Sequence, residues 1–490
     1  MKQNTLRYYQ EEDTEKGLNM RSFLLNLPRG AGKTAIILHI IHKMRILRYI
    51  SSGPILILVP VPVIPQWEEE TRKWGLLDGI SFIYKEGVKE DTSPQDNCVY
   101  VMNYETLLSK RFAQFYGLKS ETRGSGPKAR FSLIICDESH RIKNRKAKRT
   151  DAVLALSKEF GIAVSGTPVM KTPNDLWTQL KFLSLSENKS VGAHLTIPPE
   201  LMSSYHRFIE NFCRLEVNIH AAKRGIRLYD PVGLTTNVTK QQELNKILSS
   251  VTVTRSIGDL GFKSEILRNR VPLSMDRSSR QAKLYEATRK LIWEEIDEAS
   301  VSISNAAVHS LRLRQLTTCP GVLDASVGLG LKFDYITELL TDDSDEKYLV
   351  FSNWAGPAHY LQQEVNKGTK GVPHLFKDKF LSYHGGLNDA ERARVLTKFK
   401  TSPEKRVLFA TIGSLGEGVD GLQNVCNRMI FLDIPWSPGI LEQAEGRLHR
   451  MGQTKPVFVE YLEIVGTVDK AVYEIVHGRE KDIRKLFVSK

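Results

Sequence analysis

Residues 23–41 read FLLNLPRGAGKTAIILHII, an apolar run, a glycine-rich loop and a second apolar run. The first run suits a buried strand, and the second, Ala35–Ile41, suits a helix. Glycines let backbone N–H groups close around phosphate oxygens at the positive end of a helix. Lys33 would reach the β- and γ-phosphates of a nucleoside triphosphate, and Thr34 would hold Mg²⁺. Strand, loop and helix in this order favour a phosphate site over a chance loop, although Leu27 replaces the glycine of the strict pattern.

A later apolar run ends in two carboxylates. Residues 133–140 read LIICDESH, so Asp137 and Glu138 follow a candidate buried strand. Open α/β sheets bind ligands at the carboxyl ends of their strands, where this pair would meet the phosphate loop. Asp137 is a candidate Mg²⁺ ligand, and Glu138 a candidate residue to orient or deprotonate an attacking water. An acidic pair that only caps the next helix is the alternative.

Two arginines stand far along the chain, in QAEGRLHRMGQ at residues 443–453. The i, i+3 spacing of Arg447 and Arg450 predicts that they share one face of a helix. Planar guanidinium groups suit the charge that builds on a transferring phosphoryl group. The pair is too far from Lys33 in sequence to share its lobe, so a role as arginine fingers implies a cleft that closes. A solvated helix face or a nucleic-acid contact is the alternative.

Short apolar runs recur before residue 186 and again after residue 325, as expected for buried strands of parallel sheets. Between these limits helical spacing prevails, for example in residues 281–299. The sequence therefore predicts an α/β fold with three parts. These are an N-terminal nucleotide-binding lobe (1–185), a mainly helical insertion and linker (186–325) and a C-terminal lobe (326–490).

The composition favours a polyanionic partner. The chain has 69 Lys+Arg against 56 Asp+Glu, a formal net charge of +13. A basic protein without such a partner is the alternative. The five cysteines are scattered and form no C-x-x-C pair, so neither a disulfide framework nor a zinc site is expected. No run approaches the roughly 20 apolar residues of a membrane span, and we expect no membrane partner.

Together the motifs resemble the Swi/Snf helicase-like ATPases of helicase superfamily 2, over nearly the whole chain. In order, the matching segments are LRYYQ (6–10), DESHRIKN (137–144), SGTP (165–168), LRLRQL (311–316), FSNW (351–354), YHGG (383–386), DIPWSP (433–438) and residues 443–457. The last two are the most specific to the family. Three features depart from its pattern: Ser139 replaces an alanine, residues 28–31 lack the usual acidic loop containing Met-Gly-Leu, and residues 415–420 (LGEGVD) are closer to the general form of the superfamily.

The resemblance implies two RecA-like lobes of the P-loop NTPase class, each with a parallel sheet, and helical insertions between them. It implies ATP and Mg²⁺ as cofactors. The implied catalytic residues are Lys33, Asp137, Glu138, Arg447 and Arg450. The implied nucleotide contacts are Gln10 as adenine reader, Arg29, Gly30, Ala31, Gly32, Lys33, Thr34 and Gln443, with Thr34 and Asp137 at the metal ion.

The resemblance also implies ATP-driven translocation on double-stranded or branched DNA, with remodelling of DNA or protein–DNA complexes. The candidate DNA contacts are Trp67, Asn103, Thr106, Lys143, Arg145, Ser352, Trp354, Gly385 and Trp436. For each tryptophan, packing in the core is the alternative. Arg145 belongs to a run of six cations between residues 141 and 149, which otherwise forms a solvated face.

Two other functions remain open at this point. One is the motor subunit of a restriction or repair assembly, and the other is a non-catalytic nucleic-acid-binding module on an ATPase fold. The intact phosphate loop, carboxylate pair and arginine pair argue against the second. We expect a monomeric motor that is cytoplasmic or nuclear, nucleoid-associated in a prokaryote, or encoded by a virus.

Overall fold

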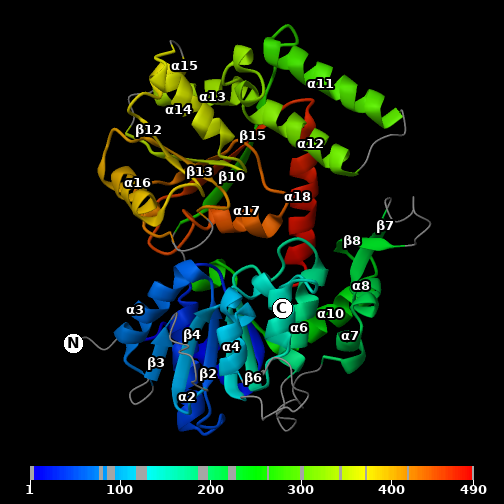
Figure 1. The fold of residues 1–490 in the computed structure, drawn as a ribbon, viewed down its shortest axis with the longest axis vertical. Coiled ribbons are helices and arrows are strands. Elements are labelled where there is room, and N and C mark those ends of the chain that lie inside the picture. Colours follow the sequence, from blue (N-terminus) through cyan, green and yellow to red (C-terminus); the bar gives the residue numbers. More distant parts are fainter. Residues whose placement is uncertain are drawn as a thin grey trace. The chain divides into compact units, whose positions relative to one another are not determined.

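The computed structural model of the chain describes residues 5–76, 81–84, 94–116, 130–185, 197–218, 228–261, 264–297, 303–341, 345–369, 372–415 and 419–487. The chain divides into two compact units, each built around its own parallel sheet (Figure 1). Unit 1 comprises Met1–Gly261 and Arg479–Lys490, and unit 2 comprises Phe262–Gly478.

Unit 1 contains a seven-stranded sheet in the order β3-β4-β2-β5-β6-β1-β9, in which all neighbours run parallel. Its elements are α1 (Tyr8–Met20), β1 (Phe23–Asn26), α2 (Lys33–Ile46), β2 (Ile55–Val59), α3 (Ile64–Trp74), β3 (Ser81–Tyr84), β4 (Cys98–Asn103), α4 (Lys110–Phe115), β5 (Phe131–Asp137), α5 (Lys148–Leu154), β6 (Lys158–Ser165), α6 (Leu176–Ser184), α7 (Pro199–Ser203), α8 (Tyr205–Phe212), β7 (Cys213–Val217), β8 (Tyr229–Leu234), α10 (Val238–Val251) and β9 (Thr252–Thr254). Because the strands are parallel, β1, β5 and β6 end at one edge, which collects the motifs that follow them.

The strands of unit 1 are apolar because helices cover them. Every residue of β2 and of β5 is buried. Leu56 and Leu58 of β2 and Ile134 and Cys136 of β5 belong to one core cluster. In each strand these two residues are two positions apart and face the same side of the sheet, while the residue between them is buried on the other side. Both faces of the sheet therefore pack against other elements.

The end of the chain also belongs to unit 1. Leu486 lies in the core cluster of this unit. The Asp482 carboxylate accepts the backbone N–H of Leu234 at 3.3 Å, at the end of the antiparallel β7–β8 hairpin. The C-terminal segment is therefore anchored to unit 1 by both apolar packing and a hydrogen bond.

Unit 2 contains a six-stranded sheet in the order β10-β15-β14-β11-β13-β12, again parallel throughout. Its elements are β10 (Ile266–Leu273), α11 (Arg280–Asp297), α12 (Ile303–Thr318), α13 (Leu331–Thr341), β11 (Tyr348–Ser352), α14 (Gly356–Asn366), α15 (Val372–Leu375), β12 (Phe380–Tyr383), α16 (Asp389–Thr401), β13 (Val407–Thr411), β14 (Arg428–Phe431), α17 (Pro438–Glu445), β15 (Val457–Ile464) and the start of α18 (Val468–Arg484). Alternate residues of β11 belong to two different core clusters, so each face of this sheet has its own core.

The segment expected to form a mainly helical insertion, residues 186–325, is divided between the units after Gly261. Its described part contains α7, α8, α10, α11 and α12, but also four strands: β7 and β8 pair with each other, and β9 and β10 extend the two sheets at their edges. The two edge strands have no long apolar run: β9 has three residues, and no residue of β10 is buried. The apolar-run criterion therefore overlooks them.

Helix α18 carries the chain from unit 2 back to unit 1. Val472 and Val476 pack in a core cluster of unit 2, whereas residues from Arg479 onward belong to unit 1. Gly478 stands between them within the helix, drawn in red in Figure 1. A Cβ atom added at Gly478 would meet nothing within 4 Å.

Candidate active site

The glycine-rich loop joins β1 to α2 as expected. Gly30 and Gly32 have φ of 78° and 74°, a left-handed conformation that favours glycine. Gly32 caps α2, which begins at Lys33, so the helix start points its N–H groups into the loop. A Cβ atom on Gly32 would lie 2.3 Å from Nε2 of Gln10, so a side chain at this position would displace the Gln10 amide from the loop.

Helix α1 packs against this loop through two side chains. Nε2 of Gln10 and the hydroxyl of Tyr9 both donate to the carbonyl of Ala31, each at 3.1 Å. The Oε1 atom of Gln10 accepts the N–H of Arg7 at 2.9 Å and caps α1. The predicted adenine reader is thus fixed directly beside the predicted phosphate loop.

Lys33 folds back over the loop. Its ammonium donates to the carbonyls of Leu27 at 3.2 Å and Pro28 at 3.4 Å. A Cβ atom on Gly166 would lie 3.0 Å from the Leu27 carbonyl and 3.6 Å from the Lys33 ammonium. The turn after β6 therefore approaches the phosphate loop closely, and glycine permits that approach.

The Asp137–Glu138 pair lies at the end of β5, and Asp137 is held from two sides. Its Oδ2 accepts the indole N–H of Trp67 at 2.9 Å, and its Oδ1 accepts the N–H of Glu138 at 2.9 Å. Burial, reinforced by the charge of Glu138, raises the pKa of Asp137 to about 6, although the Trp67 hydrogen bond and the charge of Lys33 act in the opposite direction.

Two basic side chains lie beside the carboxylate of Glu138. Its carboxylate lies 3.7 Å from Nη2 of Arg29 and 3.3 Å from Nδ1 of His140. Burial alone would raise the pKa of Glu138, but the hydrogen bond and charge of His140 and the charges of Arg29 and Lys33 hold it well below its usual range. The side chain is therefore a carboxylate at neutral pH.

Hydrogen bonds connect the carboxylate pair to the Ser165–Pro168 turn. Nδ1 of His140 lies 3.3 Å from the hydroxyl of Ser165. Ser139, which replaces the family's alanine, donates its hydroxyl to Oε1 of Gln179 at 2.7 Å. Nε2 of Gln179 in turn donates to the carbonyl of Pro168 at 2.7 Å. The departure at Ser139 thus has a partner, which sequence reasoning did not identify.

Oxygen donors are available for Mg²⁺ at this edge, namely the hydroxyl of Thr34 and the carboxylate of Asp137. Mg²⁺ bound with a nucleotide usually takes one or two protein oxygens and completes its shell with phosphates and water. No group of three or more His, Cys, Asp or Glu side chains in the described ranges could hold a metal ion by itself. The donor set therefore fits Mg²⁺ that arrives with ATP.

The arginine pair lies in unit 2, and here the structure corrects the expected helical face. Helix α17 ends at Glu445, and Arg447 and Arg450 follow it in successive turns. Both guanidinium groups still converge, because both donate to the carbonyl of Val419, at 2.9 Å and 3.3 Å. Arg450 also lies 3.3 Å from the carboxylate of Asp420. Gln443 is buried within α17.

The candidate DNA contacts differ in accessibility. Trp67 is 1% exposed, so its place beside Asp137 does not fit the predicted contact with DNA. The side-chain oxygen of Asn103 accepts the backbone N–H of Thr106 at 2.9 Å and caps a short turn. These two groups are therefore already hydrogen-bonded to each other. Ser352 is buried, whereas Gly385 is exposed and Trp436 is 39% exposed.

The basic run after the carboxylate pair is only partly available for a ligand. Arg145 is exposed and lies 4.4 Å from the centroid of the Tyr205 ring, and Arg149 pairs with Glu105 at 2.8 Å. Lys143 is half-buried, and Lys146 and Lys148 are exposed. Lys146 and Lys148 therefore present accessible charge in this run.

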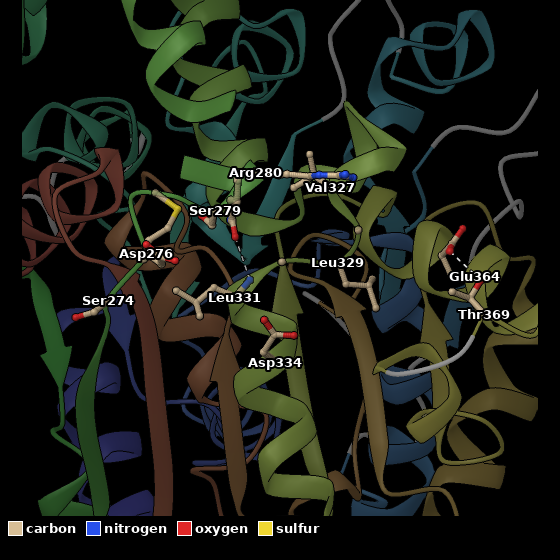
Figure 2. Close-up of a pocket in the computed structure, with 14 residues that line it drawn as sticks. Ser274, Asp276, Ser279, Arg280, Val327, Leu329, Leu331, Asp334, Glu364 and Thr369 are labelled. Carbon is tan, nitrogen blue, oxygen red and sulfur yellow. Dashed lines mark hydrogen bonds between the residues drawn. The ribbon is translucent and has the colours of Figure 1, made fainter. Parts of the chain in front are cut away.

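A pocket of about 490 Å³ in unit 2 lies away from these motifs. Figure 2 shows its lining, with Arg280 near the start of α11, Asp334 on α13 and Glu364 toward the end of α14. Glu364 is bonded to Thr369 and Lys367. With three carboxylates, a single arginine and no phosphate loop, this pocket does not suit a nucleotide.

Sequence reasoning gave no role to Arg314 and Asp433, although both stand in segments that it quoted. Nη2 of Arg314 lies 3.3 Å from the Asp433 carboxylate, and both side chains are buried. The two residues are 119 positions apart. The apolar run before Asp433 was the only available signal, because it marks a strand end like that of Asp137.

Two families match the chain. The SNF2-related domain matches residues 14–322, and the helicase conserved C-terminal domain matches residues 331–452. No helix in the described part of the chain is long and apolar enough to span a membrane.

Two curated relatives illustrate the similarity. The DNA annealing helicase and endonuclease ZRANB3 of Bos taurus is 26% identical over 446 residues, which are 88% of this chain and 36% of that protein. The uncharacterized ATP-dependent helicase YqhH of Bacillus subtilis is 25% identical over 480 residues, 93% of this chain and 75% of that protein. The chain thus spans about a third of the length of the first curated relatives.

Among solved structures, the Sulfolobus solfataricus SWI2/SNF2 ATPase core in complex with dsDNA is 20% identical, with a TM-score of 0.41, and the alignment covers 100% of this chain and 98% of that one. The SNF2-related domain alone matches more than half of the chain, and the helicase domain follows it in order. The protein therefore belongs to the SNF2-related helicase-like ATPases, a family of ATP-hydrolysing enzymes.

Proposed function

We propose that this chain is a DNA-stimulated ATPase motor that moves along duplex DNA and remodels DNA or protein–DNA complexes, branched DNA included. The observation that carries the proposal is the edge of the unit 1 sheet. There the phosphate loop, the Asp137–Glu138 pair and the Ser165–Pro168 turn are joined by short contacts. Such an edge can bind a nucleotide, and its contacts can change when the terminal phosphate is hydrolysed.

Hydrolysis would use the groups of unit 1 in separate roles. The N–H groups of the loop and of the first turn of α2 would bind the phosphates, and Lys33 would exchange its carbonyl partners for phosphate oxygens. Thr34 and Asp137 would hold the Mg²⁺ that accompanies ATP. Glu138 would orient the attacking water and accept its proton. Trp67 would keep the Asp137 carboxylate in place.

The arginine pair of unit 2 would complete the site. Arg447 and Arg450 would stabilise charge on the transferring phosphoryl group, as arginine fingers do. Since they belong to the other unit, hydrolysis would depend on both units and could be coupled to movement.

DNA as the partner is supported by several observations. The net charge of +13 attracts a polyanion. Lys146, Lys148, Gly385 and Trp436 are exposed in the structure. One matched relative is named a DNA annealing helicase, and a solved relative is described in complex with dsDNA. We infer that the motor works where DNA is kept, in the nucleus or nucleoid.

Phosphate release tests the proposal directly. We expect ATP hydrolysis that rises with duplex or forked DNA, and less with single-stranded DNA or RNA. Lys33→Ala should abolish it, whereas Lys43→Ala, on the same helix and bonded to Glu15, should keep it. Hydrolysis without any response to DNA would reject DNA as the activator. Absence of hydrolysis in the unmodified chain would favour a non-catalytic binding module.

Movement on duplex DNA needs a second assay. A translocase that does not separate strands should displace the third strand of a triplex in an ATP-dependent manner. Efficient unwinding of a plain fork without displacement of the triplex strand would identify an ordinary helicase instead. Copurification with a nuclease would favour a restriction or repair assembly.

A further inference from the structure

Two loops of unit 2 each carry a tryptophan. Trp354 follows β11, and Trp436 comes soon after β14. β11 and β14 are parallel neighbours in register, with Phe351 opposite Phe431. Both loops therefore leave the sheet at the same edge. Trp354 is half-buried and Trp436 is 39% exposed, so the second ring in particular can meet a ligand.

Arg314 of α12 lies close to both rings. Its Cζ atom is 5.2 Å from the ring centroid of Trp354 and 5.3 Å from that of Trp436. At such distances a guanidinium is attracted to the electron-rich face of an indole. The side chain is 5% exposed, and its Nη2 donates to the carbonyl of Ile434 at 2.5 Å. A buried planar cation thus contacts both loops.

Asp433 connects the two loops to Arg314. Its carboxylate accepts hydrogen bonds from the Ser352 hydroxyl at 2.8 Å and the Asn353 N–H at 3.2 Å. The same carboxylate lies 3.3 Å from Nη2 of Arg314. One ion pair therefore connects the loop after β11, the loop after β14 and helix α12. Neither loop can shift without breaking contacts to the other.

We infer that Arg314 is a positioning residue that holds Trp354 and Trp436 as one aromatic platform for a strand of nucleic acid bound by unit 2. The inference rests on the proposed function, because the platform needs DNA as its ligand. Planarity matters here: a lysine keeps the charge but cannot lie flat against two rings while donating to fixed acceptors. Arg314 touches the rings and the loops, and DNA would touch the tryptophans.

The first test measures the platform without DNA. The chain is labelled with 5-fluorotryptophan, and its six tryptophan ¹⁹F signals are assigned by single Trp→Phe variants. Arg314→Lys should shift or broaden the signals of Trp354 and Trp436 and leave those of Trp67, Trp74 and Trp177 in unit 1 unchanged. Arg312→Lys, an exposed arginine on the same helix, is the matched control and should move neither signal. Unchanged Trp354 and Trp436 signals in Arg314→Lys would overturn the inference.

The second test measures DNA. Since the two rings would no longer lie together against the bound strand, we expect Arg314→Lys to raise the DNA concentration for half-maximal ATPase roughly tenfold. The maximal rate should change less than twofold, whereas a general structural defect would lower both. An unchanged half-maximal concentration, with DNA stimulation intact in the unmodified chain, would also overturn the inference.

A second variant guards against misfolding. Trp436→Leu removes the more exposed ring, so it should move the Trp354 signal through Arg314, and an unmoved signal would argue against the coupling.

Failure of the proposed function would give a different set of results. If the unmodified chain shows no response to DNA, the proposed DNA partner fails, and the inferred role in DNA binding fails with it. The ¹⁹F signals then decide separately whether Arg314 holds the two rings.

Discussion

Glu138, a candidate catalytic residue, has a strained backbone conformation. Its φ of 49° and ψ of 52° place it in the left-handed region, which costs a non-glycine residue roughly 1–3 kcal/mol. The conformation is held by the Asp137 carboxylate, which accepts the Glu138 N–H, and by Arg29 and His140 around the side chain. The strand end thus directs two successive carboxylates to different partners.

Replacement of the carboxylate should separate binding from turnover. Glu138→Gln keeps the size and hydrogen-bonding reach of the side chain but removes the base. We expect hydrolysis to fall by about 10²–10⁴-fold while ATP affinity stays within a few-fold. A fluorescent ATP analogue and a phosphate-release assay measure the two quantities. Glu159→Gln, at a site bonded to Ser51, is the control. Equal turnover of Glu138→Gln and the unmodified chain would remove Glu138 from the mechanism.

His384 offers a pH test in unit 2. Burial, with the nearby charges of His359 and Arg392, lowers the pKa of His384 from 6.5, and Glu391 opposes this weakly. Its Nδ1 accepts the Gly386 N–H, and its Nε2 lies 3.2 Å from Nε2 of His359. Because the pKa is lowered on folding, the neutral ring stabilises the fold above pH 6.5, and this contribution is lost as pH falls through the lowered value.

An NMR titration of the histidine ring signals checks this expectation. The midpoint of His384 should lie below 6.5, and His359→Asn should raise it because a like charge is removed. A midpoint at or above 6.5 in the unmodified chain would contradict the arrangement of the two rings.

Elements differ in how far the sequence determines them. Buried strands such as β2 and β5 could be predicted because helices cover both faces and only apolar residues fit. Strand β10 could not, because it lies at an edge and its Arg268 pairs with Glu445 of a distant segment. The phosphate loop was predictable from local spacing alone. The Arg314–Asp433 pair was not, since its partners meet only after the sheet forms.

Helix ends explain another difference. The spacing of Arg447 and Arg450 predicted one helical face, but α17 ends at Glu445, with Gly446 next. Glycine is a poor helix former, and the following residues continue as turns. The guanidinium groups of Arg447 and Arg450 nevertheless both donate to the carbonyl of Val419. The two cations are therefore neighbours, as their spacing predicted, although they do not share a helical face.

The contribution of the basic run, residues 141–149, to DNA binding can be tested by varying the salt concentration. Each phosphate contact adds about 0.9 to the slope of log affinity against log salt on duplex DNA. Replacing Lys146 and Lys148 by Gln should therefore flatten that slope by roughly 1.8 if both touch phosphate. Arg149→Gln should change the slope less, because Arg149 already pairs with Glu105. An unchanged slope in the double variant would leave these lysines as a solvated face.

At the scale of the whole molecule, the residues that we propose for ATP hydrolysis come from both units. Arg447→Ala and Arg450→Ala should each lower the maximal hydrolysis rate by about 10³-fold or more, the usual value of an arginine finger. DNA affinity, measured by fluorescence anisotropy, should change only slightly. Lys455→Ala, in the same unit beyond the arginine pair, is a control that should keep the rate. Loss of DNA binding with intact DNA-free hydrolysis would assign the arginine to the DNA instead.

The open surroundings of Gly478 have a mechanical consequence. A glycine within a helix stabilises it less than alanine by about 1 kcal/mol, so Gly478 weakens α18 where the chain passes from one unit to the other. Gly478→Ala meets no steric obstacle and should stiffen this joint, with a higher melting temperature and a lower DNA-stimulated turnover. Alanine at the exposed Lys470, earlier in the same helix, should not slow turnover. If the stiffened helix turns over ATP at the normal rate, bending at Gly478 has no part in the cycle.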